Sequence, residues 1–229
     1  MNGNLYLVST PIGNMDDITL RALEVLKESD MIVCEEFKMG RRLLSVFGIE
    51  KDLTELNEHN EKESAEEVIE ALKGGENVAL ISDAGTPLFS DPGHYLVELC
   101  LANDIRVVPV PGANSLLPAL IGSGLDFERF FYYGWLSPKK EIRRKELKRL
   151  KNMQETLVIL DTPYRLRTLL KDVLLIFGKH QKIVVAYQLT MKKKEEFLRG
   201  GVAEILTEVE SKSLKGEFVL LIDNKQRRG

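Results

Sequence analysis

The sequence predicts an α/β protein made of two lobes. Its 229 residues and 26.0 kDa are enough for one large α/β domain or two small ones. Short β-branched or apolar runs alternate with longer amphipathic segments, which is typical of a mainly parallel sheet with crossover helices. The alternation is interrupted between residues 112 and 124 and then resumes. We therefore expect one α/β lobe over residues 1–115 and a second over residues 116–229.

In the first lobe, short apolar runs indicate strands and apolar positions at helical spacing indicate helices. Leu20, Leu23 and Leu26 fall on one helical face behind Asp16 and Asp17, which we expect to cap that helix. The other expected elements are strands at Leu5–Thr10, Met31–Cys34, Val78–Ser82 and Arg106–Val110, and helices at Arg41–Phe47, Ser64–Leu72, His94–Ala102 and Asn114–Ile121.

The second lobe opens on a segment of unusual composition. Six of the sixteen aromatic residues lie in Phe127–Trp135, and Lys139–Lys151 follows with eight basic side chains against two acidic ones. Phe130, Phe131 and Tyr133 alternate as in a half-buried strand, which favours a place for these side chains in the core. For Tyr132 and Trp135 the sequence leaves two roles open, core packing and stacking on nucleotide bases. The elements expected after it are strands at Thr156–Leu160, Ile183–Ala186, near Phe197 and at Phe218–Ile222, and helices at Leu166–Phe177 and Val202–Val209.

Composition excludes several classes of protein. Thirty-two basic and thirty-five acidic residues give a net charge of −3, which excludes a uniformly basic nucleic-acid coat but not a local basic patch. Cys34 and Cys100 match no metal-ligand spacing and are interpreted as small buried hydrophobes in a reducing compartment. The sequence has neither a targeting segment nor an apolar run of membrane-spanning length, so we expect a cytoplasmic protein with no membrane partner.

Common nucleotide, metal and hydrolase signatures are missing from the sequence. Gly122-Ser123-Gly124 lacks the third glycine of a dinucleotide fingerprint and follows an expected helix. No Gly-Lys-Ser/Thr indicates a P-loop, and no Gly-x-Ser-x-Gly indicates a serine hydrolase. Three scattered histidines without a Cys/His cluster predict no metal site.

Three loops at expected strand ends carry small residues and prolines. They are Ser9–Asn14, Ser82–Pro87 and Pro109–Ser115. Ligands of open α/β sheets sit outside the carboxyl ends of the strands, where such loops converge. Small residues there let a flat ligand approach the backbone, and a carboxylate such as Asp83 can bind an ammonium or hydroxyl group. The loops therefore predict a small-molecule site at this edge of the sheet.

Four segments carry a resemblance to a known family. Leu5–Asn14, Asp17–Leu23, His59–Glu61 and Ser82–Gly93 resemble the family of ribosomal RNA small subunit methyltransferase I, within the tetrapyrrole methylase superfamily. The string Asp-Ala-Gly-Thr-Pro-x-x-Ser-Asp-Pro-Gly is long and specific, and the resemblance covers nearly the whole chain. It implies the two-lobed tetrapyrrole methylase fold (class III S-adenosylmethionine methyltransferase), with a mixed sheet flanked by helices in each lobe.

The resemblance also implies an activity. Members of the family use S-adenosylmethionine (SAM), folded in a cleft between the lobes, to methylate the 2′-oxygen of a cytidine ribose in 16S rRNA, usually as homodimers. Carried over by position, the cofactor-binding residues are Pro11, Ile12, Asp83, Ala84, Gly85, Thr86, Ser115 and Leu116 from the first lobe, and Leu160, Ala186 and Gly216 from the second.

Three strand-end segments depart from the family pattern. Glu35-Glu36-Phe37-Lys38 replaces Glu-Asp-Thr-Arg, Asp161-Thr162-Pro163-Tyr164-Arg165 replaces Glu-Ser-Pro-His-Arg, and Tyr187-Gln188-Leu189-Thr190-Met191 replaces Arg-Glu-Leu-Thr-Lys. These segments are expected to face the substrate, so methyl transfer is inferred while the acceptor stays open. Two alternatives remain: a tetrapyrrole C-methyltransferase, and a SAM- or RNA-binding paralogue with an altered acceptor or no catalysis. The first loop lacks the glycine-rich pattern usual in the former.

Candidate catalytic and substrate residues follow from the chemistry of 2′-O-methylation. A ribose hydroxyl is a weak acid, so a general base or a hydrogen-bond acceptor beside it should help. The candidate carboxylates are Glu35, Glu36 and Asp161, and the cations that could hold a phosphate are Lys38 and Arg165. The substrate-side candidates are Asn14 and, in the basic run expected to bind an RNA polyanion, Lys139, Lys140, Arg143 and Arg144. The position of His59 before the acidic helix favours a structural hydrogen bond, and the family resemblance keeps this residue as a further substrate-side candidate.

Overall fold

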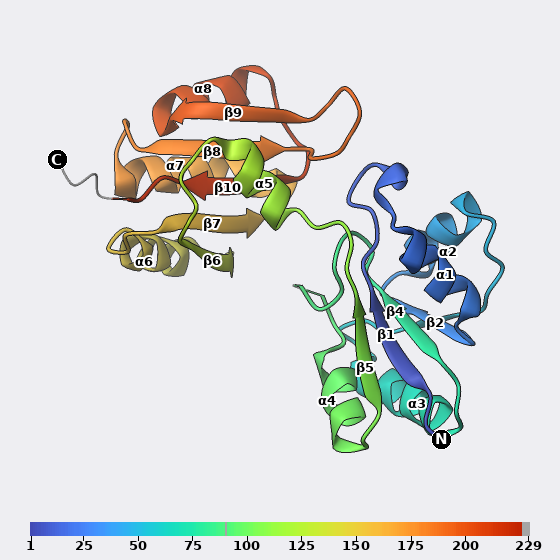
Figure 1. Cartoon of the computed structure of the whole chain (residues 1–229). Helices are drawn as coiled ribbons and strands as arrows, with labels where there is room; N and C mark the ends of the chain where they lie inside the picture. Colours follow the sequence, from blue (N-terminus) through green and yellow to red (C-terminus); the bar gives the residue numbers. More distant parts are fainter. Residues whose placement is uncertain (90, 226–229) are drawn as a thin grey trace. The chain divides into compact units, whose positions relative to one another are not determined.

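The computed structural model describes residues 1–89 and 91–225. The chain forms two compact units, Met1–Asn114 and Ser115–Gly229. Each unit contains its own five-stranded sheet with helices packed on it (Figure 1).

Unit 1 is a parallel α/β unit whose five strands end at one edge. The strand order is β3-β2-β4-β1-β5, and every pairing in it is parallel. The carboxyl ends of the strands, and the loops that leave them, therefore share one side of the sheet. The elements are β1 (Asn4–Val8), a 3-10 turn η1 (Met15–Asp17), α1 (Leu20–Glu28), β2 (Met31–Cys34), α2 (Phe37–Val46), β3 (Leu53–Glu55), α3 (Glu61–Lys73), β4 (Val78–Ile81), α4 (His94–Ala102) and β5 (Arg106–Val110).

Helices cover both faces of this sheet. Val33, Val78 and Leu80 point to the face that packs against α3 and α4, whereas their neighbours Ile32 and Ala79 pack on the side of α1 and α2. Strands buried on both faces explain why β2 and β4 are continuous apolar runs without alternation.

Unit 1 departs from the sequence expectations in three places. Its pairings are all parallel, so the expectation of a mixed sheet in each lobe is wrong here, because each strand returns through a crossover helix. The short strand β3 was not expected. Asp16 and Asp17 form the separate turn η1, and Thr19 caps α1 by accepting a 3.0 Å hydrogen bond from the amide of Ala22.

Unit 2 has the mixed sheet that was expected. The strand order is β6-β7-β10-β8-β9; β6 and β7 are parallel, and the other pairings are antiparallel. The central strand β10 therefore begins where β7 and β8 end. The elements are α5 (Leu116–Ser123), β6 (Phe130–Trp135), α6 (Lys140–Leu150), β7 (Thr156–Asp161), a 3-10 turn η2 (Pro163–Arg165), α7 (Leu166–Phe177), β8 (Lys182–Tyr187), β9 (Glu196–Gly201), α8 (Val202–Ser211) and β10 (Phe218–Ile222).

The aromatic segment of unit 2 lies on the edge strand β6 rather than in the core. Phe130 and Phe131 are each 37% exposed, so their expected place in the core is wrong, and Trp135, whose place the sequence left open, is 46% exposed. Tyr133 alone of the alternating trio packs partly against the core. An edge strand has a neighbour on one side only, and β6 pairs with β7 alone.

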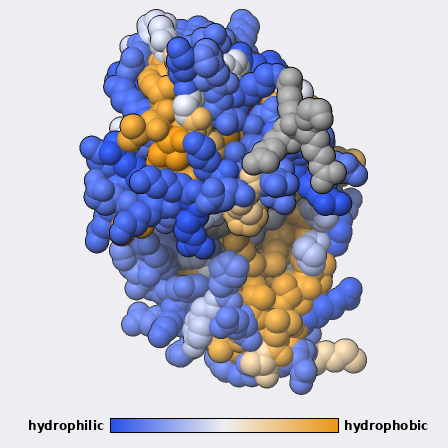
Figure 2. Space-filling model, turned by 90° about the vertical axis from the view of Figure 1, so that its left-hand side faces the viewer, coloured by the Kyte–Doolittle hydropathy of each residue, from blue (hydrophilic) through white to orange (hydrophobic). Residues whose placement is uncertain are grey.

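Hydrophobic patches are set in a largely hydrophilic surface on the face drawn in Figure 2. In the part of the chain that the structure describes, no helix has both the length and the apolar character needed to cross a membrane.

Candidate functional site

Backbone hydrogen bonds join two of the three predicted loops of unit 1. The amide of Thr10 donates to the carbonyl of Gly85 at 2.8 Å, and the amide of Gly85 donates back to the carbonyl of Thr10 at 3.1 Å. The Thr10 hydroxyl also donates to the carbonyl of Ser82 at 2.9 Å. This pairing brings the predicted cofactor residues Pro11 and Ile12 beside those of the second loop, Asp83, Ala84, Gly85 and Thr86.

The third loop joins the other two through small residues. Ser9 and Thr86 share a hydrogen bond between their hydroxyls at 3.1 Å, and Thr86 also donates to the carbonyl of Ala113 at 3.3 Å. A Cβ on Gly112 would lie 2.8 Å from the Cβ of Ser9, so only glycine fits there without a shift. Gly85 has a φ of +94°, which glycine adopts readily.

The third loop leads directly into unit 2. It ends at Asn114, and Ser115 is the N-cap of α5, whose first residue is Leu116. Ser115 and Leu116, the two other cofactor candidates assigned to the first lobe, thus lie at the start of a helix that directly follows the three loops in the chain.

Carboxylates collect at the same edge. Asp83 Oδ1 accepts a 3.3 Å hydrogen bond from the amide of Glu36, and burial raises the pKa of Asp83. Burial, followed by the negative charges of Asp83, Asp91 and Glu36, raises the pKa of Glu35 to about 7. Such a concentration of negative charge favours a cationic ligand.

This edge fits SAM, which carries a sulfonium and an ammonium group. The carboxylates at this edge supply the charge opposite to these two groups, and the loop glycines let the loops pack closely on one another. In residues 1–89 and 91–225 no three His, Cys, Asp or Glu side chains are grouped as a metal site.

The predicted substrate residues of unit 1 are more dispersed. Asn14 caps η1 by accepting a 3.2 Å hydrogen bond from the amide of Asp16. Lys38 is exposed on α2. The His59 side chain is 84% exposed, and its Nε2 lies 3.5 Å from a carboxylate oxygen of its neighbour Glu58. His59 is thus paired locally and not with the three loops.

In unit 2, sheet register aligns two predicted cofactor residues. Leu160 on β7 and Ala186 on β8 both pair with Val219 of the strand between them. Directly paired residues point to the same face, so the two side chains share a face about 10 Å apart. Ile159 and Val185 belong to the large core cluster of the unit on the opposite face. α5 contacts β8 and β10.

The Lys215–Gly216 turn is held by Tyr187, the last residue of β8, and by Gln188, which follows it. The Tyr187 hydroxyl accepts hydrogen bonds from the amides of Gly216 at 2.8 Å and Lys215 at 3.3 Å. A Cβ on Gly216 would lie 2.4 Å from Gln188 Nε2, so the glycine is needed for this packing. Gln188 itself has a positive φ of 45°. Sequence reasoning singled out Gly216 but missed the supporting roles of Tyr187 and Gln188.

Asp161 is a buried carboxylate with one oxygen engaged. Its Oδ1 accepts hydrogen bonds from the amide of Thr162 at 2.7 Å, and Arg165 Nε lies 3.2 Å from the same oxygen. Burial raises its pKa, although the Thr162 amide and the Arg165 charge oppose that rise. Asp161 Oδ2 and the Thr162 hydroxyl are buried without a hydrogen-bond partner among the described residues. A bound ligand with a donor group would satisfy the carboxylate oxygen.

Arg165 and Arg143, both predicted to bind phosphate, are used within the fold. Arg165 Nη2 donates to the carbonyls of Leu136 and Ser137 at 3.1 and 2.9 Å. Arg143 is 3% exposed and forms a 2.7 Å ion pair with Asp172, so its assignment as an RNA contact is wrong. Helix periodicity turns it inward with Leu147 and Leu150.

The other predicted cations of the basic run remain accessible. Lys139 precedes α6 and Lys140 is its first residue, and both are exposed. Arg144 keeps 30% of its side chain exposed while its Nε donates to Asp172 at 2.7 Å. The described part of unit 2 therefore offers cations on α6.

Comparison with known proteins identifies the class to which this fold belongs. A family model for Tetrapyrrole (Corrin/Porphyrin) Methylases matches residues 4–206, and the chain belongs to that family. In the solved structures, a uroporphyrin-III C-methyltransferase from Thermus thermophilus, complexed with S-adenosylhomocysteine, superposes with a TM-score of 0.67. It is 19% identical and aligns over 96% of this chain and 97% of its own. The predicted fold and the predicted class, a SAM-dependent methyltransferase, are confirmed.

Within this family, the chain is similar to proteins of one name. The chain is 43% identical over 221 residues to ribosomal RNA small subunit methyltransferase I of Bacillus subtilis, covering 96% of this chain and 75% of that protein. It is 44% identical to the protein of the same name in Pseudomonas aeruginosa, over 96% of this chain and 78% of the relative. The resemblance inferred from the sequence is confirmed.

Proposed function

We propose that this protein methylates ribosomal RNA of the small subunit at the 2′-oxygen of a cytidine ribose, with SAM as methyl donor. The observation that carries the proposal is the hydrogen-bonded cluster of Ser9–Asn14, Ser82–Thr86 and Gly112–Asn114, beside an acidic group suited to a cation. The names of relatives at 43 and 44% identity support rRNA as the acceptor.

The cofactor residues act by position and charge. We assign Pro11, Ile12 and Asp83 through Thr86 to the SAM site from unit 1, and Ser115, Leu116, Leu160, Ala186 and Gly216 from unit 2. Bound SAM supplies a methyl group on a sulfonium, an excellent leaving group. Much of the acceleration then comes from alignment of the two reactants and exclusion of water. The carboxylates of unit 1 offset the positive charge of the cofactor.

A carboxylate is assigned to the acceptor hydroxyl. As the methyl carbon moves from sulfur to the ribose 2′-oxygen, the C–S bond breaks, a C–O bond forms and the hydroxyl proton must leave. Glu35, with its pKa near 7, is suited to accept that proton at neutral pH. Glu36 and Asp161 are the other two candidates. Because Asp161 is buried with one oxygen lacking a hydrogen-bond partner, it is better suited to accept a hydrogen bond from a ligand than to exchange a proton with solvent.

RNA contacts are assigned to accessible cations. Lys139, Lys140 and Arg144 are proposed to bind phosphates, with Lys38, Asn14 and His59 on the substrate side of unit 1. We also propose that the protein is cytoplasmic and acts as a homodimer, as the family resemblance implies.

Methyl transfer to purified subunits tests the function. Tritiated SAM would be incubated with 30S subunits from a strain that lacks this gene, and the labelled nucleotide would be mapped. Label on a cytidine 2′-oxygen is expected, and E35Q is expected to lower kcat at least tenfold while leaving the Kd for SAM within a few-fold. Tight SAM binding without label would refute the rRNA acceptor and favour the non-catalytic paralogue. Porphyrinoid absorbance in purified protein would favour the tetrapyrrole alternative.

A further inference from the structure

A basic groove runs between α6 and α7 of unit 2. Its volume is 570 Å3. Its α6 side is lined by one carboxylate and four cations, Glu141, Arg144, Lys145, Lys148 and Lys151, and its α7 side by Leu175 and Ile176.

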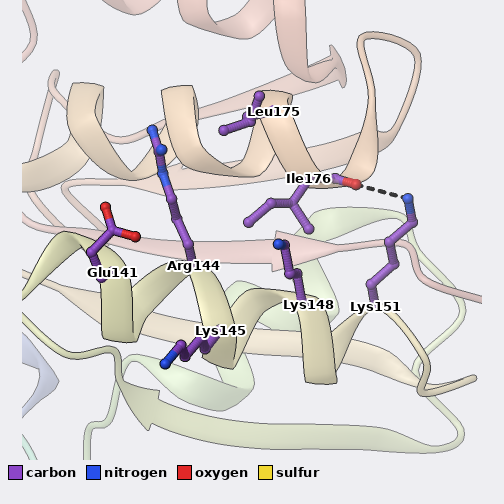
Figure 3. Close-up of a pocket in the computed structure, with 7 residues that line it drawn as sticks. All are labelled: Glu141, Arg144, Lys145, Lys148, Lys151, Leu175 and Ile176. Atoms are coloured by element: carbon purple, nitrogen blue, oxygen red, sulfur yellow. Dashed lines mark hydrogen bonds between the residues drawn. The ribbon is translucent and has the colours of Figure 1, made fainter.

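The cations form a stripe that faces the second helix. Figure 3 shows the side chains of Arg144, Lys148 and Lys151 extending from α6 toward α7. They are spaced four and three residues apart, which places them on one helical face over about 10 Å at 1.5 Å per residue. A row of positive charge of that length matches a short run of consecutive phosphates.

Contacts within the unit hold two of these cations in place. Arg144 Nε donates to Asp172 at 2.7 Å, and Lys151 Nζ donates to the carbonyl of Ile176 at 2.7 Å (Figure 3). The Asp172 carboxylate is also paired with the buried Arg143, so two arginines share one negative charge. The four cations of the lining outnumber the carboxylates of Glu141 and Asp172, so the groove keeps a positive excess.

The opposite wall adds an apolar surface. Leu175 is 63% exposed at the groove although its neighbours on α7, such as Val173, are buried. Cations beside an exposed aliphatic side chain suit a strand of RNA, whose phosphates seek cations and whose sugars and bases offer weakly polar faces.

We infer that the groove between α6 and α7 is a binding site for the phosphate backbone of single-stranded RNA. The inference rests on the proposed function in taking rRNA as the substrate. It adds Lys145, Lys148 and Lys151 to the RNA contacts and gives the RNA strand a path along α6, which begins directly after the carboxyl end of β6.

The double variant K145Q/K148Q tests the groove, with K27Q/K62Q as its matched control. Both pairs are exposed helix lysines, and both variants remove two positive charges. K145Q/K148Q is expected to raise the KM for 30S subunits about tenfold at 0.1 M salt, with kcat and the Kd for SAM unchanged. Its binding to polyuridylate should show a log–log salt slope shallower by about 1.4, since each phosphate contact on a single strand contributes roughly 0.7. The control should match the wild type.

The outcomes separate the groove from the proposed function. If the wild type methylates subunits and K145Q/K148Q has the KM and salt slope of the control, the groove inference is overturned and the function stands. If the wild type methylates nothing but K145Q/K148Q still flattens the polyuridylate slope, the groove stands and the proposed acceptor fails. An unchanged slope in that case overturns both. Thermal unfolding of each variant excludes misfolding as the cause.

Discussion

The loop edge of unit 1 and the α6–α7 side of unit 2 use charge in opposite ways. In unit 1 the carboxylates Glu35, Glu36 and Asp83 gather beside backbone loops with few cations among them, and burial raises the pKa of Glu35 and Asp83. In unit 2 the buried carboxylate Asp172 is paired with Arg143 and Arg144, and cations are left over.

The difference matches two ligands of opposite charge. A protein of net charge −3 cannot attract both a cationic cofactor and a polyanion over its whole surface, so the two attractions must be local. In unit 1, carboxylates outnumber cations where we propose that the sulfonium of SAM binds. In unit 2, cations outnumber carboxylates where we propose that RNA binds. Variants at the charged residues and loops of each unit test whether the two units bind ligands of opposite charge.

The largest effect is expected from D172N in unit 2. Asp172 is the partner of Arg143, which is 3% exposed, and loss of that carboxylate leaves a buried guanidinium charge without a counter-ion. We expect the free energy of unfolding to fall by about 3–5 kcal/mol, measured by urea denaturation.

The control for D172N is E210Q. Glu210 pairs with Lys171 at 2.8 Å, but both side chains are exposed, so its loss should change stability far less. Equal losses in the two variants would show that burial of the Arg143–Asp172 pair does not matter.

The next effect is expected from G112A in unit 1. The new Cβ would lie 2.8 Å from the Cβ of Ser9 and push two of the joined loops apart. We expect a loss of about 1–3 kcal/mol of stability and at least a tenfold weaker Kd for SAM by calorimetry.

G48A is the matched control for G112A. Gly48 has a φ of +62° but open space around its missing Cβ, so alanine there strains the backbone without touching the loops. G48A should lose stability and keep the SAM affinity of the wild type. An unaltered SAM affinity in G112A would argue that the third loop lies outside the cofactor site.

The smallest expected effect is a pH dependence of SAM affinity, which the substitution E35Q should remove. With a folded pKa of about 7, above its ordinary value of 4.5, Glu35 holds a proton in the native protein that the unfolded chain has released. Its contribution to stability therefore falls as pH rises from 4.5 to 7. A cation prefers the ionised carboxylate, so SAM affinity should rise by less than tenfold between pH 6 and 7.5.

Calorimetric titrations of wild type and E35Q across that range check this expectation. The wild-type curve should rise and the E35Q curve should stay flat. Parallel curves would assign the pH dependence to Asp83 or Asp91 instead.

The central strands and the loop cluster could be predicted because local signals agree there. β4 and β10 are unbroken apolar runs, since both of their faces are covered, and the glycines at 85 and 112 stand where loops approach closely. At the two loops, glycine is required for close packing of the backbone and also marks the site that the sequence predicts for a ligand.

Features that depend on distant partners could not be predicted. Arg143 is buried because Asp172, 29 residues away, meets it inside unit 2, although its spacing to Leu147 and Leu150 was a signal that it faces inward. The exposure of Phe130 and Trp135 follows from the edge position of β6, which no local pattern encodes. Likewise β3 has only three residues and pairs with β2 alone.

The division of the chain at residues 114 and 115 has a consequence for synthesis. Every strand of the first sheet is contributed by residues before this point, and every strand of the second by residues after it. A ribosome adding roughly 5–20 residues per second needs on the order of ten seconds to add residues 115–229 after residue 114. Unit 1 can thus leave the exit tunnel and fold while unit 2 is still being translated.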